Sequence, residues 1–183
     1  MIEEKTVIQH IKNWIEQVVI KHDFCPFAAK AFIQKSIYFV VEDGKEEAIC
    51  LEEFMMMALA LDRQPKIETA FIIFSNAFEK FEDYLDFFDL AQHVLTDQEY
   101  DGIYQIASFH PNYQFEGSSI DDAANFTNRS PYPMLQLIRE ESIEKVLETY
   151  DNPESIPQRN IELTRSFGIE KMKKMLKKCF TKL

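Results

Sequence analysis

The sequence predicts an α+β fold: a mixed sheet of about four strands with helices packed on it, in a single globular domain over residues 1–183. Segments with apolar residues at helical spacing alternate with short runs of β-branched and aromatic residues. A chain of 183 residues has the length of one domain and can bury roughly 70% of its unfolded surface. The last two predicted strands follow each other without an intervening helix, which predicts some antiparallel pairing.

The beginning of the chain predicts two helices and a strand. Apolar residues recur every three or four positions over residues 5–20, as in an amphipathic helix. A second helix is expected over residues 27–32, with Pro26 in its first turn and Cys25 at or near its N-terminal cap. Residues 36–41 are rich in strand-forming side chains and end at a turn signal, so they predict the first strand.

The middle of the chain predicts two helices and two strands in alternation. Residues 46–61 predict a helix, and a following proline marks its end. Residues 68–75 are apolar throughout their centre, which predicts an internal strand. Apolar positions over residues 81–95 indicate another amphipathic helix, and a third strand is expected over residues 103–109.

The end of the chain begins with a long irregular segment, residues 110–133. A loop of this length within a compact domain is usually functional or disordered, and its aromatic residues argue against disorder. A fourth strand is expected over residues 134–139, then a helix from a cap at Ser142 to Tyr150. Asn160 is expected to cap the last helix.

Charge and cysteine usage narrow the class of protein. The formal net charge is −11, and because nucleic acids and anionic membranes attract positive proteins, we expect neither as a partner. No run of about 20 apolar residues is present, so no membrane span is expected. Three cysteines without motif spacing and the lack of a signal-peptide pattern predict a cytoplasmic location.

Lysines are concentrated at the end of the chain, from residue 169 onward. The simplest interpretation of this run is a solvated helix face. The alternative is a basic surface that binds an anionic partner.

The strongest candidate for chemistry is His110, which leaves a predicted strand and enters the long loop. Reactive groups are commonly placed where a rigid strand meets solvent, and a neutral imidazole can act as base, acid or metal ligand near pH 7. Gln105 and Tyr113 flank it and are candidates for substrate binding. The alternative is a histidine that only holds the loop by hydrogen bonds.

A second group of polar residues follows in the same loop, comprising Asp121, Asn125, Asn128 and Arg129. The carboxylate and the amides could orient the histidine or hold a cation, and the guanidinium could bind a carboxylate or phosphate at two points. The alternative is that these side chains satisfy backbone groups within the loop without any chemistry.

A thiol and a second arginine complete the candidates. Cys25 precedes a predicted helix, whose dipole is expected to lower the pKa of the thiol and make it a nucleophile. Its alternative is a buried packing residue. Arg139 either joins Arg129 in binding an anion or forms a structural ion pair with Glu140.

Four short motifs stand out: Phe-Cys-Pro-Phe-Ala at 24–28, Gln-Ile-Ala-Ser-Phe-His-Pro at 105–111, Asn-Arg-Ser-Pro-Tyr-Pro at 128–133 and Leu-Ile-Arg-Glu at 137–140. Together they resemble a bacterial family known as domain of unknown function 1415. The likeness covers nearly the whole chain and implies a small cytoplasmic protein whose motif residues form one site, without implying an activity. Many relatives carry His at the position of Gln136, which implies that this position is not an obligatory metal ligand or base.

The leading hypothesis from the sequence is an enzyme that acts on a small anionic metabolite. His110 would be the general base or acid, oriented by Asp121 or Asn128. Cys25 would be a nucleophile or redox thiol, and Arg129, with Arg139, would bind the anion.

Two other hypotheses remain open at this stage. One is a metal-binding protein that uses Cys25, His110 and a carboxylate such as Asp121. The other is a non-catalytic domain that binds a ligand or partner through its long loop. The sequence specifies no substrate, reaction type, cofactor or oligomeric state.

Overall fold

Four strands form one mixed sheet, which confirms the predicted α+β class. The computed structural model describes residues 2–148, 150 and 152–181. The strands lie in the order β1 (Ile37–Glu42), β2 (Thr69–Phe74), β4 (Met134–Arg139) and β3 (Tyr104–Phe109). β1 pairs with β2 in parallel, whereas β4 is antiparallel to both β2 and β3. The central strands β2 and β4 are buried on both faces, which was predicted for β2 from its apolar sequence.

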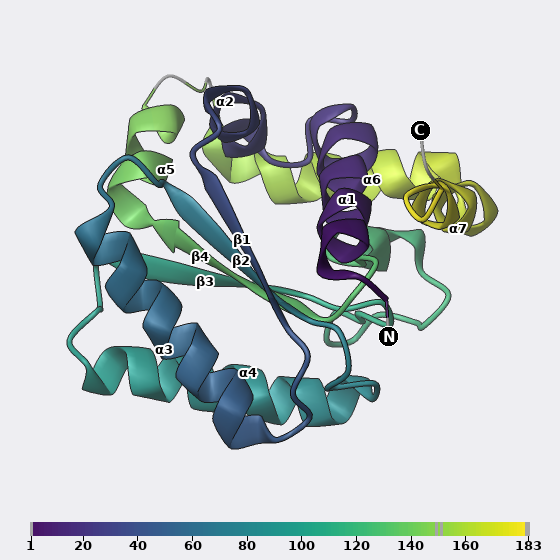
Figure 1. Cartoon of the computed structure of the whole chain (residues 1–183). Coiled ribbons are helices and arrows are strands. Elements are labelled where there is room, and N and C mark those ends of the chain that lie inside the picture. The colour runs from purple at the N-terminus through teal and green to yellow at the C-terminus, as the bar shows by residue number, and fades with distance from the viewer. Residues whose placement is uncertain (1, 149, 151, 182–183) are drawn as a thin grey trace.

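One face of the sheet is closed by α3 (Glu47–Arg63) and α4 (Phe81–Asp97), as Figure 1 shows. Alternate side chains of β2, from Ala70 to Phe74, point into this layer. They pack against large aromatic side chains of the two helices, which fill the space between helix and sheet. The fully buried members of this layer include Phe54, Tyr84 and Phe87.

The opposite face is covered by elements from both ends of the sequence (Figure 1). α1 (Glu4–Trp14) continues into a short π-helix, η1 (Ile15–Ile20), and α2 (Pro26–Gln34) follows. α6 (Ile156–Phe167) and α7 (Ile169–Lys178) complete this layer. In its core, the Trp14 ring of α1 packs edge-on against Phe109 of β3, which in turn contacts Phe71 of β2.

The structure differs from the sequence expectations mainly at the ends of elements. The single helix expected over residues 5–20 changes to π geometry at Ile15. The long segment 110–133 contains a 3-10 helix, η2 (Ala123–Thr127), and α5 spans Glu140–Leu147, so it begins two residues before the expected cap. The expected continuation of this helix to Tyr150 includes residue 149, which lies outside the described residues.

The last predicted helix is in fact two helices. η3 (Pro153–Ser155) leads into α6, so Asn160, predicted as a helix cap, lies inside α6 instead. Gly168 has a φ of +76° and separates α6 from α7. Only glycine adopts this conformation without strain, so the chain can change direction there.

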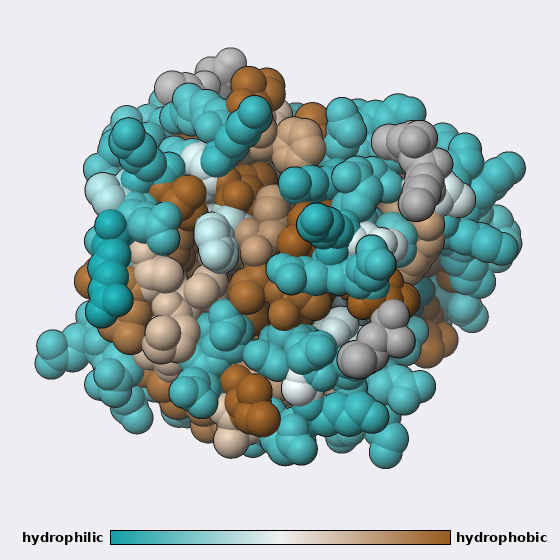
Figure 2. All heavy atoms as spheres, in the orientation of Figure 1, coloured by the Kyte–Doolittle hydropathy of each residue, from teal (hydrophilic) through white to brown (hydrophobic). Residues whose placement is uncertain are grey.

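Hydrophilic residues cover most of the face seen in Figure 2, with apolar atoms gathered around β1, an edge strand of the sheet. Across the described part of the chain, no helix has both the length and the apolar character required to cross a membrane.

Candidate functional site

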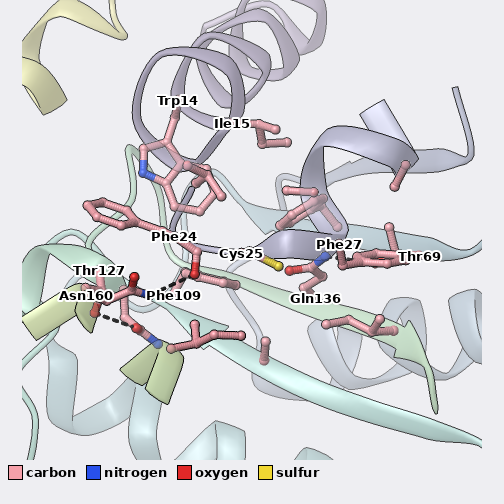
Figure 3. Close-up of a pocket in the computed structure, with 18 of the residues that line it drawn as sticks. Trp14, Ile15, Phe24, Cys25, Phe27, Thr69, Phe109, Thr127, Gln136 and Asn160 are labelled. Carbon is pink, nitrogen blue, oxygen red and sulfur yellow. Dashed lines mark hydrogen bonds between the residues drawn. The ribbon is translucent and has the colours of Figure 1, made fainter. Parts of the chain in front are cut away.

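A cavity of about 380 Å³ lies between the sheet and the helices of the α1 layer. Its floor comes from β2, β4 and β3, and its walls come from α1, η1, α2, η2 and α6. Most of its lining is apolar or aromatic, and Figure 3 shows these side chains around the opening. The lining residues are Trp14, Ile15, Val19, Phe24, Cys25, Phe27, Ala28, Ala31, Ile37, Thr69, Phe71, Ala107, Phe109, Phe115, Thr127, Asn128, Gln136, Ile138, Ile156, Pro157, Asn160 and Ile161.

Small side chains help to explain why this face has a large cavity, whereas the hollow between α3 and the sheet measures only about 10 Å³. Ala28 and Ala31 of α2 face the cavity where larger residues would fill it. On the sheet, Ala107 of β3 is the register partner of Gln136 in β4, so a small residue lies beside the polar one. The opposite layer instead places bulky aromatic side chains against the sheet.

Gln136 is the most unusual residue of the cavity because it is a polar residue at the centre of a buried strand. Its Nε2 donates to Thr69 Oγ1 at 2.9 Å, and Thr69 Oγ1 donates to the Leu137 carbonyl at 2.7 Å. Within the described residues, the carboxamide oxygen of Gln136 accepts no hydrogen bond. The oxygen is open to the cavity instead of being enclosed by protein atoms, so water or a bound molecule can donate a hydrogen bond to it.

Two asparagines at the other end of the cavity are engaged by the protein itself. Asn128 Nδ2 donates to the Ser108 carbonyl at 3.1 Å, and its Oδ1 accepts from Thr127 at 3.0 Å. Asn160 Nδ2 donates to the Phe24 carbonyl at 2.8 Å. These amides therefore hold the cavity wall in place and leave Gln136 as the open acceptor.

Cys25 is the N-cap residue of α2, as predicted, and its sulfur lies beside the cavity (Figure 3). Burial raises the pKa of the thiol, and hydrogen bonds from the backbone of Phe27 and Ala28 only partly offset this. The expectation of a lowered pKa was therefore wrong, because desolvation of the thiolate outweighs the field at the start of the helix. Near neutral pH, the Cys25 side chain is therefore a protonated thiol.

His110 does not line the cavity and is only 1% exposed. Its Nε2 donates to the Phe78 carbonyl at 2.8 Å, and its Nδ1 accepts from the Asn112 N–H at 3.0 Å. The ring packs against Phe81 and Tyr84 of α4. Both ring nitrogens are thus used by the backbone, and burial lowers the pKa of the imidazole.

Arg129 and Asn125 fasten the long loop to itself. Arg129 donates through Nε to the Tyr113 carbonyl at 3.0 Å and through Nη2 to the Ile120 carbonyl at 2.9 Å. The Asn125 carboxamide accepts from the Phe115 N–H at 3.0 Å and donates to the Ser119 carbonyl at 2.9 Å. Neither residue lines the cavity, and the same holds for Tyr113.

The remaining candidates lie elsewhere on the molecule. Asp121 is exposed, and Gln105 is exposed on the edge strand β3. Arg139 donates through Nε to the Ile67 carbonyl at 2.8 Å, and its Nη2 also bonds the Leu61 carbonyl at the end of α3. Because these acceptors belong to the chain around the end of α3, Arg139 fastens β4 to that helix.

The structure therefore brings only two of the predicted site residues, Cys25 and Asn128, to one cavity. It places His110 and Arg129 in separate hydrogen-bond networks. Sequence reasoning about spacing did not select Gln136 as a site residue. The available signal was its polar side chain within the otherwise apolar strand Met-Leu-Gln-Leu-Ile.

In the stretches 2–148, 150 and 152–181, no group of three or more His, Cys, Asp or Glu side chains is arranged to hold a metal ion. Cys25 and His110 in particular contact different layers of the fold.

Comparison with known proteins gives one match. Residues 6–174 match the family described as Protein of unknown function (DUF1415). No curated protein and no solved structure matches the chain. The matched residues cover α1 through most of α7, and they include every residue that lines the cavity. The chain therefore belongs to the DUF1415 family.

Proposed function

We propose that this protein binds a small, uncharged and mostly apolar molecule in the cavity between the sheet and the α1 layer. The observation that carries the proposal is the chemistry of the lining. Apolar and aromatic side chains dominate it, and Cys25 is its one ionisable side chain among the described residues. A volume of about 380 Å³ falls within the range of about 300–1,000 Å³ typical of small-molecule pockets.

Gln136 suggests one polar requirement for the ligand. Its carboxamide oxygen is open to the cavity, while its nitrogen is already bonded to Thr69. A ligand that carries one hydroxyl or N–H group would complete this acceptor. The preferred ligand is therefore apolar with a single hydrogen-bond donor.

A small anionic metabolite fits this cavity less well. An anion would need a cation or several free donors to replace its water, and transfer of an unpaired charge costs several kcal/mol or more. Arg129 and Arg139 direct their guanidinium groups at backbone carbonyls away from the lining. The ligand-binding hypothesis thus takes precedence over the anion-processing one.

Thiol chemistry on the bound ligand is a second candidate, favoured by the position of Cys25 beside the cavity (Figure 3). Burial raises the pKa of this thiol, so any reaction at neutral pH would start from the protonated sulfur and from an electrophilic ligand. Cys25→Ser should then retain binding and lose the reaction.

The binding proposal is tested with a matched pair of fluorescent probes. N-phenyl-1-naphthylamine is uncharged and carries one N–H, and 8-anilino-1-naphthalenesulfonate is the same skeleton with an added sulfonate. We expect the uncharged probe to bind. The sulfonate should displace it only at concentrations at least tenfold higher than those at which the uncharged probe itself binds. Bound probe should also slow the modification of Cys25 by iodoacetamide, followed by mass spectrometry of the peptide that contains it.

Ala28→Leu and Ala29→Leu provide the matched variants. Both residues lie on α2, but only Ala28 lines the cavity. Leucine at position 28 should weaken probe binding at least tenfold by filling the cavity, whereas leucine at position 29 should leave it within about twofold of wild type. Thermal unfolding checks that both variants fold. Equal affinities in all three proteins, or no saturable binding by wild type, would rule out this cavity as the site.

A further inference from the structure

A second hollow of about 280 Å³ lies between η1 and α7. It shares no lining residue with the apolar cavity, and its lining is mostly basic instead of apolar. We call it the lysine hollow. It is lined by Gln17, Lys21, His22, Lys171, Lys174, Met175 and Lys178.

The spacing of the lysines places them together on α7. Lys171, Lys174 and Lys178 are three and four residues apart, so they share one face of the helix. Lys21 follows η1 and joins them from a segment about 150 residues earlier in the chain. Lys173 and Lys177 lie on the same helix but do not line the hollow.

The charges of the four lining lysines are not neutralised by the described residues. The nearest acid on α7, Glu170, lies 3.3 Å from the ammonium of Lys173 instead. Lys171 contacts only a ring face, with its Nζ 3.8 Å from the centre of Phe167. Four like charges around one hollow create a positive potential that attracts an anion.

Two residues other than lysine, Gln17 and His22, supply polar groups to the lining. The Nε2 of Gln17 is buried and has no hydrogen-bond partner among the described residues. His22 also lines the hollow, and its pKa is lowered by burial and by the charges of Lys21 and Lys171. The lining thus offers several cationic or neutral donors and no carboxylate.

We propose that the lysine hollow binds a soluble small molecule that carries at least two phosphate groups. Ammonium groups are compact point charges that suit phosphate oxygens, and the hollow contains no arginine fork for planar recognition of a carboxylate. A volume of about 280 Å³ is larger than one phosphate requires. The overall charge of −11 disfavours an extended polyanion such as a nucleic acid, which would also meet the acidic remainder of the surface.

This proposal is independent of the ligand proposed for the apolar cavity, because the two hollows share no lining residue. The test uses calorimetric titration of the full chain with sodium tripolyphosphate at low ionic strength. Wild type should bind it saturably and at least tenfold more tightly than orthophosphate. Affinity should fall as salt is raised, since the interaction is electrostatic.

Two double variants separate the hollow from general charge. Lys174→Gln with Lys178→Gln removes two lining lysines, and Lys173→Gln with Lys177→Gln removes the same charge from the rest of α7. The first should weaken tripolyphosphate binding at least tenfold, and the second by less than threefold. All four lysines are exposed, so both proteins should fold.

Three results would overturn the proposal. Wild type could fail to bind tripolyphosphate at millimolar concentration. The two double variants could lose affinity equally, which would indicate diffuse attraction to α7. Alternatively, the protein could bind phosphatidylinositol 4,5-bisphosphate vesicles through Lys174 and Lys178 without binding free tripolyphosphate, which would identify a lipid headgroup instead of a soluble ligand.

Discussion

At the scale of single residues, His110 is held in its neutral form by the backbone on both sides. The Phe78 carbonyl requires a proton on Nε2, and the Asn112 N–H requires a lone pair on Nδ1. Protonation of Nδ1 would place two donors against each other, in a position that is already buried. The ring therefore couples the stability of the fold to pH.

This coupling predicts acid sensitivity. Burial lowers the folded-state pKa of His110 below its ordinary value of 6.5. As pH falls below 6.5, the unfolded chain takes up a proton that the folded ring resists, so the free energy of unfolding should decrease. Urea denaturation at pH 7.5 and pH 5.5 measures this decrease.

His110→Gln is the control for that measurement. The variant should be less stable than wild type at pH 7.5 by about 1–3 kcal/mol, because the buried Phe78 carbonyl and Asn112 N–H lose well-aligned hydrogen bonds. It should lose less stability than wild type between the two pH values. His10 and His22 also have lowered pKa values and remain in both proteins, so some pH dependence persists. An identical decrease in both proteins would argue against titration of His110.

The candidate site was predictable from the sequence only in part. Residue types showed that Cys25 and Asn128 were worth attention, and both line the cavity. The proximity of Gln136 to Cys25 depends on the register of β4 and on the approach of α2 to the sheet. Those are long-range packing outcomes, and no local pattern encodes them.

At the scale of elements, the long segment between β3 and β4 owes its order to a few interior bonds. Arg129 joins Tyr113 to Ile120 across it, and its guanidinium lies 4.6 Å from the Phe126 ring. The Trp14 indole of α1 donates to the Arg129 carbonyl at 3.1 Å. The loop is thereby tied both to itself and to the helix above it.

Arg129→Lys tests this role. Lysine cannot donate in two directions from a rigid plane, so at least one carbonyl should lose its partner. We expect a loss of about 1–3 kcal/mol in the free energy of unfolding, measured in urea. Cleavage of segment 110–133 by thermolysin under native conditions should also become faster.

Arg165→Lys is the matched comparison. Arg165 pairs with Asp122 of the same loop, but its side chain is 59% exposed. Exposed ion pairs contribute little to stability because water and salt screen them, so this change should have a small effect. Equal destabilisation by the two substitutions would mean that Arg129 is not the main support of the loop.

The existence of the helices and strands was largely predictable, because each carries a strong apolar period. Their ends were less so. The change from α to π geometry at Ile15 has no signal in the residue pattern. The separation of α6 from α7 depends on the positive φ of Gly168, which a single glycine within a helical pattern signals only weakly.

At the scale of the whole molecule, the two faces of the sheet are packed to different degrees. Side chains of α3 and α4 fill one face, whereas the α1 layer leaves a cavity on the other. The mixed character of the sheet followed from the order of the predicted strands. The spatial order β1-β2-β4-β3 did not, since it places β4 between two strands that precede it in the chain.

The cavity predicts a linkage between ligand and stability. A molecule that binds only the folded chain, present at 100 times its dissociation constant, should raise the free energy of unfolding by about 2.7 kcal/mol. Urea denaturation with and without N-phenyl-1-naphthylamine measures the difference. At the same probe concentration, Ala28→Leu should gain at most about 1.4 kcal/mol, since its affinity is at least tenfold weaker, and Ala29→Leu should match wild type. An undiminished increase in Ala28→Leu would indicate that the probe binds elsewhere.

The walls of the cavity come from distant parts of the sequence, since Trp14 of α1 and Ile161 of α6 both face it. During synthesis, α1 is exposed on the ribosome long before α6 is made. The cavity cannot enclose a ligand until α6 has left the ribosome and packed against the rest of the fold. A bound ligand would therefore distinguish the completely folded protein from a newly made chain that has not yet folded.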